Sequence, residues 1–243
     1  MCRLLPEHIE RINLRLPKLE AHYRSITGMS LLEIAHFAAE TYYLPLWVRK
    51  RIRVACVPIT ADEGILSGFS ETVALILREF ADVDAFVTET ADVTGFNEAV
   101  HRDADLVYLA DDTTCICRNL RTGVMSDNGF ATGRGFAALL YLSSCALHQE
   151  VLILGSGKVG AAAYHFLAER NVLLKWFDLK ENNLYSLDSE HFSKAWEQKA
   201  WDSIIDATDA PAFIGAEQVK EGAVIAAPGI PFGLTEAAES KAR

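Results

Sequence analysis

Three glycines with the spacing G-x-G-x-x-G lie near the middle of the chain, at Gly155, Gly157 and Gly160. An apolar run at 151–154 precedes them, and a helix-forming run at 161–170 follows them. In this pattern the first glycine permits a tight turn, the second lets the backbone approach a pyrophosphate, and the third lets helix and strand pack closely. The unpaired N–H groups at the helix start would donate hydrogen bonds to phosphates. The pattern predicts a dinucleotide site.

An acidic residue follows the next predicted strand, which covers 172–177. Asp178 stands 23 residues after Gly155 (178 − 155), where a carboxylate can accept hydrogen bonds from both hydroxyls of a ribose. Its charge disfavours a 2′-phosphate, so the sequence predicts NAD as the cofactor. Two alternatives are a turn that needs only small residues and a site for the methyl donor S-adenosylmethionine. The complete unit of strand, helix, strand and acid favours NAD.

The predicted cofactor site also draws on the segments that follow the strands at 203–206 and 223–227. Ligands of open parallel sheets bind at the carboxyl ends of the strands. The alternative for these two segments is a pair of ordinary strand-to-helix turns. The cofactor-binding residues expected are Gly155, Ser156, Gly157, Lys158, Val159, Gly160, Asp178, Ala207, Thr208 and Pro228.

The rest of the chain begins with two predicted helices, at 6–26 and 29–43. Strands then alternate with helices, which predicts parallel strands joined by right-handed crossovers. The expected strands are 52–59, 85–88 and 106–110, and the expected helices are 70–80, 95–101, a long apolar helix at 133–147 and one near 191–201.

We therefore predict an α/β protein with two lobes. Residues 1–148 would form an N-terminal helical cap with a small α/β substrate lobe, and 149–243 would form a Rossmann-type NAD-binding lobe. The apolar helix at 133–147 would be buried between the lobes.

Composition excludes several classes of protein. A formal net charge of −10 argues against a nucleic-acid partner, which requires clustered Lys and Arg. We find no signal peptide and no apolar run of about 18 residues, so we expect a cytoplasmic protein with no membrane partner. The five cysteines have irregular spacing, and Cys115 and Cys117 lack a second pair, so no metal is expected. Cys56 and Cys145 are predicted to be reduced core residues.

Polar residues that follow the strands of the small lobe are the remaining candidates for chemistry. Thr60 comes after the first strand, and Asp111 and Asp112 come after the third. A carboxylate there could hold a substrate ammonium, or it could cap the next turn, and position alone does not separate the two roles. Ser70 is expected to be a helix N-cap. None of the seven histidines follows a strand, so we name no catalytic residue.

Six segments together resemble the pyrrolysine-forming dehydrogenase family of pyrrolysine biosynthesis. They occur in the family's order between residue 4 and about residue 234, and those outside the glycine motif are the more specific. The segments are 57–60 (Val-Pro-Ile-Thr), 68–72 (Gly-Phe-Ser-Glu-Thr), 92–95 (Asp-Val-Thr-Gly), 110–114 (Ala-Asp-Asp-Thr-Thr), the glycine motif at 155–160, and 228–231 (Pro-Gly-Ile-Pro).

The resemblance implies a reaction and a substrate site. A lysine that carries methyl-D-ornithine on its side-chain nitrogen would be oxidised by NAD at the carbon bearing the ornithine's terminal amine. Loss of ammonia and ring closure would then give pyrrolysine. Leu4, Thr60, Ala61 and Asp111 would contact this amino-acid substrate, while Asp112 would cap the turn. The sequence is compatible with a homodimer.

The chain departs from the family at two places. Ala61 stands where the family usually has serine, so only a backbone contact is possible there. The family also continues beyond the Pro-Gly-Ile-Pro segment with a further strand and helix, whereas 12 residues follow Pro231 here (243 − 231). We therefore expect a C-terminal segment to be missing. Two other functions stay open: an NAD-dependent dehydrogenase of another small metabolite, and a non-catalytic NAD-binding protein.

Overall fold

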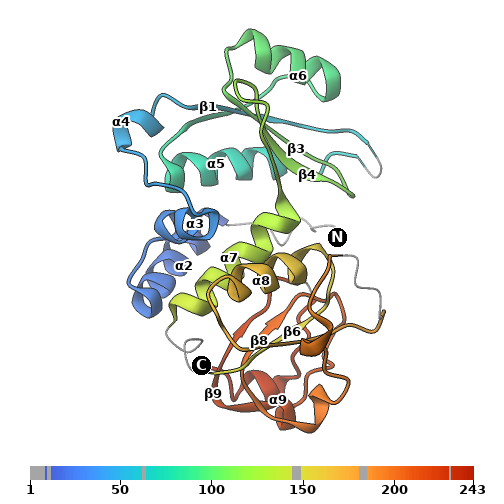
Figure 1. Ribbon diagram of the computed structural model, residues 1–243. Coiled ribbons are helices and arrows are strands. Elements are labelled where there is room, and N and C mark those ends of the chain that lie inside the picture. The colour runs from blue at the N-terminus through green and yellow to red at the C-terminus, as the bar shows by residue number, and fades with distance from the viewer. Residues whose placement is uncertain (1–8, 10–11, 62–63, 144–148, 181–184, 230) are drawn as a thin grey trace. The chain divides into compact units, whose positions relative to one another are not determined.

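The chain forms two compact units, which we call the first and the second unit. The computed structural model in Figure 1 describes residues 9, 12–61, 64–143, 149–180, 185–229 and 231–243. The first unit comprises Met1–His22, Ser30–Glu33 and Tyr42–Asn128, and the second comprises Tyr23–Met29, Ile34–Thr41 and Gly129–Arg243. The long apolar helix thus belongs with the second unit. The domain boundary between residues 148 and 149 stays a prediction.

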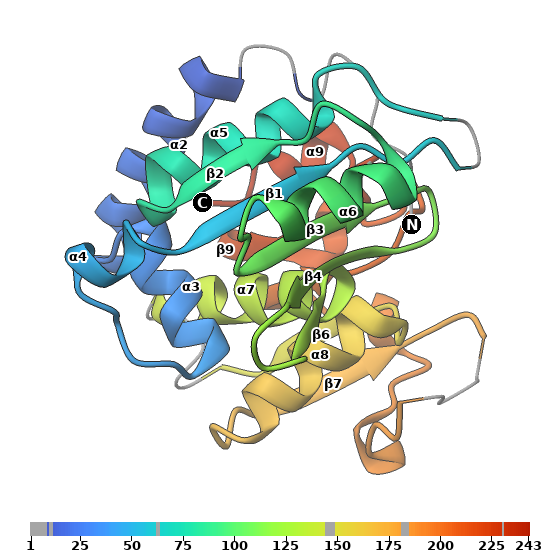
Figure 2. The ribbon, with the colours of Figure 1, turned by 90° about the horizontal axis from the view of Figure 1, so that it is seen from above.

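The first unit is built on a five-stranded sheet in the order β2-β1-β3-β4-β5. β1 runs parallel to β2 and β3, whereas β4 is antiparallel to both β3 and β5 (Figure 2). The sequence predicted the first three strands but not β4 or β5. The elements are β1 (Arg53–Val57), α5 (Phe69–Ala81), β2 (Asp84–Val87), α6 (Asp92–His101), β3 (Leu106–Ala110), β4 (Cys115–Asn119) and β5 (Met125–Asp127).

Helices α5 and α6 cover opposite faces of this sheet, as Figure 1 shows. Val54 and Cys56 of β1 pack with Ala74 of α5, while the residues that alternate with them pack with Ala99 of α6. Side chains of a strand point alternately to its two faces, so a nearly continuous apolar strand is what a sheet covered on both faces requires. Cys56 is a free, buried thiol, as predicted.

The N-terminal helices are α2 (Ile12–Thr27), α3 (Leu31–Ala39) and the short α4 (Leu46–Arg49). They agree with the predicted helices at 6–26 and 29–43, and α2 continues through Pro17. α5 has Gly68 at its N-cap position, with φ of 79°, so the prediction that Ser70 caps it is wrong. Ser70 lies one position inside the helix and is buried. Across the part of the chain that the structure describes, the helices are all too short or too polar to cross a membrane.

The second unit is built on a four-stranded, fully parallel sheet in the order β7-β6-β8-β9. The strand predicted at 151–154 is β6, and the helix opened by the glycines is α8. The elements are α7 (Asn128–Leu142), β6 (Val151–Leu154), α8 (Lys158–Ala168), β7 (Leu174–Phe177), β8 (Trp201–Asp206), β9 (Val219–Ala226) and α9 (Glu236–Glu239).

The helix predicted near 191–201 is wrong. This segment contains two single 3₁₀ turns, Ser189–His191 and Trp196–Gln198, and then becomes extended. Trp201 already belongs to β8, and its indole N–H donates to the carbonyl of Trp196 over 2.9 Å. Both tryptophans are buried in the core beneath the sheet. Their burial in strand and turn therefore outweighs the local helical pattern.

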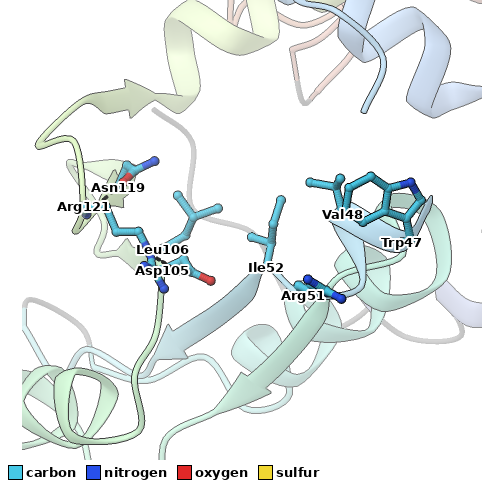
Figure 3. A pocket seen from close by; sticks show the side chains of 8 residues that line it. All are labelled: Trp47, Val48, Arg51, Ile52, Asp105, Leu106, Asn119 and Arg121. Carbon is cyan, nitrogen blue, oxygen red and sulfur yellow. Dashed lines mark hydrogen bonds and ion pairs between the residues drawn. The ribbon is translucent and has the colours of Figure 1, made fainter. Parts of the chain in front are cut away.

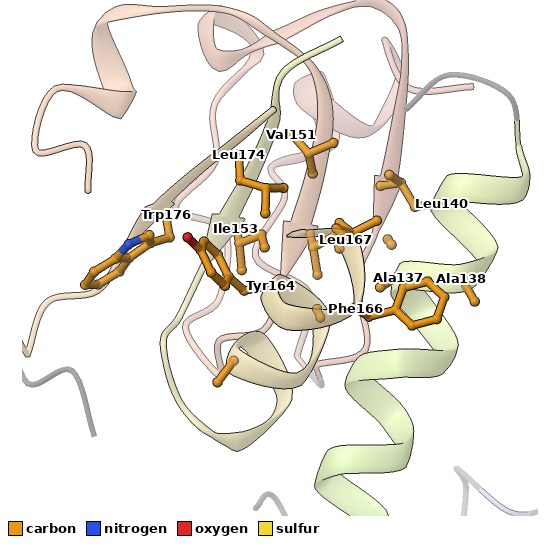
Figure 4. Close-up of a cluster of buried hydrophobic side chains, with 14 of the residues drawn as sticks. Ala137, Ala138, Leu140, Val151, Ile153, Tyr164, Phe166, Leu167, Leu174 and Trp176 are labelled. Carbon is orange, nitrogen blue, oxygen red and sulfur yellow. The ribbon is translucent and has the colours of Figure 1, made fainter. Parts of the chain in front are cut away.

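Two cores lie on the two faces of the parallel sheet. Figure 4 shows the larger one, in which α7 and α8 pack against Val151 and Ile153 of β6. The alternate side chains of β6, Leu152 and Leu154, pack with Trp196 on the other face. α7 and α8 approach closely at Gly133, where an added Cβ would lie 2.1 Å from the carbonyl oxygen of Val159. This contact ties the buried helix to the start of α8.

Candidate functional site

The three motif glycines have different structural roles in the turn between β6 and α8. Gly155 has φ of 90°, a conformation that favours glycine, and Gly157 is the N-cap residue of α8. A Cβ added to Gly160 would lie 1.8 Å from the carbonyl oxygen of Gly155, so the fold itself requires that glycine. A Cβ added to Gly157 would meet no atom of the described residues within 4 Å. The open space at Gly157, in front of the helix N-terminus, fits a phosphate group.

The carboxylate of Asp178 lies against this glycine turn. Its Oδ2 accepts hydrogen bonds from the backbone N–H of Ser156 (2.6 Å) and from the Ser156 hydroxyl (2.9 Å). Its Oδ1 accepts from the N–H of Lys180 (2.8 Å). Asp178 directly follows β7, the neighbour of β6 in the sheet. The acid is therefore held beside the turn where the ribose next to a bound pyrophosphate would lie.

A buried acid that the sequence analysis did not select holds the segments that follow β8 and β9. Asp206, the last residue of β8, has an exposed fraction of 0%. Its Oδ1 accepts from the N–H (3.1 Å) and the hydroxyl (2.7 Å) of Thr208, and its Oδ2 accepts from the N–H of Gly233 (3.0 Å). Burial raises the pKa of Asp206. Asp206 ends its strand instead of following it, and an acid at the end of the apolar run Ser203–Asp206 was the available signal.

These bonds bring the predicted residues Ala207, Thr208 and Pro228 to one edge of the sheet. The N–H of Ala207 donates to the carbonyl of Leu154 over 2.8 Å, so the segment after β8 begins beside the glycine turn. The segment after β9 lies against it, since a Cβ on Gly229 would be 2.1 Å from the Thr208 carbonyl oxygen. All four strand ends of the predicted cofactor site thus meet at the carboxyl edge.

In the first unit, Asp111 follows β3 and caps its own turn. Its Oδ1 accepts from the N–H (2.7 Å) and hydroxyl (2.9 Å) of Thr113 and from the N–H of Thr114 (2.6 Å). The N–H groups of Thr113 and Thr114 are the main reason why the pKa of Asp111 is lowered. Asp111 is thus a capping carboxylate of this turn, while the capping role expected of Asp112 stays a prediction. None of these three bonds uses Oδ2 of Asp111, so capping and ligand binding are compatible.

Thr60 follows the adjacent parallel strand, β1, and is tied to the start of α6. Its N–H donates to Oδ1 of Asp92 over 2.8 Å, and its hydroxyl donates to Oδ2 over 2.5 Å. Ala61 is exposed, and its carbonyl accepts from the N–H of Gly64 (3.0 Å). Leu4 lies outside the described residues. Sequence reasoning had not singled out Asp92 as a partner of Thr60.

A pocket of about 450 Å³ lies at the opposite edge of the first unit's sheet (Figure 3). Its lining includes Ile52, which precedes β1, together with Leu106 at the start of β3 and Asn119 at the end of β4. Ile52 and Leu106 mark the amino ends of the parallel strands β1 and β3, and Asn119 lies at the same edge because β4 is antiparallel to β3, whereas Thr60 and Asp111 follow the carboxyl ends of β1 and β3. The pocket is therefore separate from the candidate site.

Comparisons with known proteins connect this arrangement to one family. Residues 8–126 match the family model described as "Pyrrolysine biosynthesis protein PylD, N-terminal domain". The chain is 29% identical to the pyrrolysine synthase of Methanosarcina barkeri over 245 residues, which covers 99% of this chain and 90% of that protein. The chain is therefore similar to a pyrrolysine synthase over nearly its whole length. The pyrrolysine synthase of Methanosarcina acetivorans is also 29% identical, over 99% of this chain and 92% of its own length.

The fold of the chain is also similar to that of a solved dehydrogenase. It is similar to the shikimate 5-dehydrogenase of Thermus thermophilus, solved in complex with NADP(H) and shikimate, with a TM-score of 0.51 and 16% identity. The match covers 79% of this chain and 86% of that one. The predicted α/β architecture, N-terminal helices with a small α/β lobe followed by a Rossmann-type lobe, is confirmed, although the sheet of the small lobe is mixed and not fully parallel as expected. The missing C-terminal segment stays a prediction.

Proposed function

We propose that this chain is an NAD-dependent pyrrolysine synthase. It oxidises the carbon bearing the terminal amine of 3-methylornithyl-N6-lysine, after which ammonia is lost and the ring closes to give pyrrolysine. The observation that carries the proposal is the 29% identity to two pyrrolysine synthases over 99% of the chain. Sequence similarity that came from one shared domain would not extend over both units.

The residues at the carboxyl edge of the second unit fit a dinucleotide. Gly157 leaves open space beside the N–H groups of the first turn of α8. These N–H groups belong to Lys158, Val159 and Gly160. We assign Asp178 and Ser156 to the adenine ribose, and Ala207, Thr208 and Pro228 to the nicotinamide half. When bound, NAD supplies a hydride acceptor. The negative charge of Asp178 supports a preference for NAD over NADP.

The substrate contacts proposed in the first unit are Thr60, the backbone of Ala61, and Asp111, with Leu4 from the N-terminal segment. Both side chains that the structure describes here offer oxygen atoms to a cationic amine. A carboxylate that binds an ammonium orients the neighbouring carbon for hydride loss. Hydride leaves only when the amine at that carbon is neutral, so a proton must leave first, and we assign it to water. A homodimer stays a prediction.

The direct test is to incubate the purified chain with NAD and 3-methylornithyl-N6-lysine. We expect reduced cofactor to accumulate and mass spectrometry to show pyrrolysine and ammonia. Binding of NAD without turnover would instead support a non-catalytic NAD-binding protein. Turnover of a different amine or amino acid alone would support a dehydrogenase of another metabolite.

A further inference from the structure

Thr60 and Asp92 form a two-point contact between the segment after β1 and the start of α6. Both hydrogen-bond donors of Thr60, its N–H and its hydroxyl, are directed to the two oxygens of one carboxylate. The N–H of Asp92 in turn donates to the carbonyl of Pro58 over 2.9 Å. In Figure 2, α6 lies over β1 and β3. The contact joins residues 32 positions apart and orients the Thr60 side chain.

The contact determines which way the hydroxyl proton of Thr60 points. An ionised carboxylate has no proton to donate, so the hydroxyl must be the donor in the 2.5 Å contact. The Thr60 hydroxyl and, after it, the Thr60 N–H lower the pKa of Asp92, which is therefore ionised at neutral pH. Thr60 is exposed, and only the lone pairs of its Oγ1 are left for a ligand.

Asp111 presents the same hydrogen-bonding character on the neighbouring strand. β1 and β3 are paired in parallel up to Val57 and Leu109, so Thr60 and Asp111 both follow carboxyl ends at one edge of the sheet. Asp111 accepts three hydrogen bonds through Oδ1, and these bonds leave its Oδ2 unused. Two acceptors at this edge match a group with several N–H donors and a positive charge, which is a primary ammonium.

The backbone conformation of Asp92 limits the residue types that could replace it in the contact with Thr60. Its φ is 54°, in the left-handed region, where Asp and Asn are the side chains most readily accepted after glycine. Glycine would fit the backbone but would release both donors of Thr60. Asparagine would fit the backbone and keep the shape of the side chain, which makes it a precise probe of the proton's direction.

We propose that Asp92 is a specificity-determining positioning residue, which takes the hydroxyl proton of Thr60 and thereby keeps Thr60 Oγ1 an acceptor for the substrate ammonium. This role rests on the proposed function, because it requires an amine substrate. Asp92 itself need not touch the substrate. It acts through the direction of one hydrogen bond.

The test compares Asp92→Asn, Thr60→Val and the double variant by calorimetric binding of 3-methylornithyl-N6-lysine. In Asp92→Asn the amide oxygen must face the Thr60 N–H, so the amide NH₂ faces Thr60 Oγ1. The Thr60 proton then points outward, toward the ammonium. We expect Kd to rise by about 10-fold to 100-fold, as for loss of a hydrogen bond to a charged group. Thr60→Val, which removes the acceptor without adding a donor, should raise Kd less.

The decisive result is whether the effects of the two substitutions on the binding free energy of the substrate are additive. If Asp92 acts through Thr60, then Asp92→Asn adds nothing in the Thr60→Val background, and NAD affinity and thermal unfolding stay near wild type in the single variants. An equal loss with and without the Thr60 hydroxyl overturns the proposal and leaves Asp92 a structural residue. A wild-type chain that binds the substrate without turning it over contradicts the proposed function alone. No binding of the substrate contradicts both.

Discussion

The N–H of Gly233 donates to Oδ2 of Asp206 over 3.0 Å, which fastens the segment after β9 to the end of β8. The contact is tight, since a Cβ on Gly233 would lie 2.3 Å from the same oxygen. The other carboxylate oxygen holds Thr208. One buried acid therefore sets the spacing of two segments that we assign to the cofactor site. Burial of its ionised form costs desolvation free energy.

The first prediction concerns the pH dependence of stability. Because burial raises the pKa of Asp206, the folded protein binds this proton at a pH where the unfolded chain, near its ordinary value of 3.8, does not. The contribution of Asp206 to the free energy of unfolding is therefore fully present below about pH 3.8 and is lost as pH rises through the folded-state pKa.

Urea unfolding of wild type and Asp206→Asn, between neutral pH and pH of about 4, measures this effect. Asparagine does not titrate, so the substitution itself changes the free energy of unfolding by the same amount at every pH. The effects of the other carboxylates cancel when the free energy of the variant is subtracted from that of wild type. We expect wild type to gain stability relative to Asp206→Asn as pH falls. A difference that is flat, or that changes in the opposite direction, would show that the Asp206 pKa is not raised.

The second prediction separates the two roles of the motif glycines. Gly157→Ala adds a Cβ at φ of −66°, where no atom from the described part of the chain lies within 4 Å, so we expect a change in unfolding free energy within ~0.5 kcal/mol. The same Cβ would occupy the space assigned to the pyrophosphate, so NAD affinity should fall by roughly tenfold or more, about 1.4 kcal/mol.

Gly160→Ala is the matched control, because its Cβ would meet the carbonyl oxygen of Gly155 at 1.8 Å. Overpacking of this kind costs about 1–3 kcal/mol, so thermal unfolding should occur at a clearly lower temperature. Should Gly157→Ala bind NAD as wild type does, the pyrophosphate does not lie at this turn.

The third prediction concerns the choice between NAD and NADP. Asp178→Asn keeps an oxygen that can accept from Ser156, but it removes the charge and turns an amide NH₂ toward the N–H of Lys180. We expect NAD to bind more weakly by ~1–3 kcal/mol, and the ratio of NAD to NADP affinity to fall, because a 2′-phosphate is no longer repelled. Calorimetric titration of both cofactors checks this. Equal affinity of the native chain for the two would contradict the assigned role.

The fourth prediction compares the two neighbouring carboxylates after β3. Asp111→Asn retains an oxygen that can accept from Thr113 and Thr114, so the turn should persist, but the charge that we propose holds the substrate ammonium is lost. We expect roughly a tenfold or larger drop in kcat/KM with unchanged unfolding and NAD affinity. Asp112→Asn serves as the control and should remain near wild type. Steady-state kinetics showing the reverse order would mean that the two assignments are exchanged.

Several elements were predictable because their signals are local. The run at 151–154, the motif glycines and Asp178 all belong to one strand-helix-strand unit. The residue type needed at each of these positions depends on the local backbone and on near neighbours in the sequence. β4 (Cys115–Asn119) and β5 carry no comparable pattern. β4 is a strand because it pairs with β3 and β5 on its two sides, and such pairing depends on the rest of the sheet.

The sequence by itself determined that the chain alternates strands and helices and which segments follow strand ends, and it predicted where a dinucleotide would bind. Only the tertiary structure decided which carboxylate serves which donor. Asp92 meets Thr60 across 32 positions, and Asp206 meets Gly233 across 27. These contacts arise from the order in which strands pair. Local periodicity reports which face of an element is apolar, but it carries no information about which distant N–H or hydroxyl a carboxylate will accept.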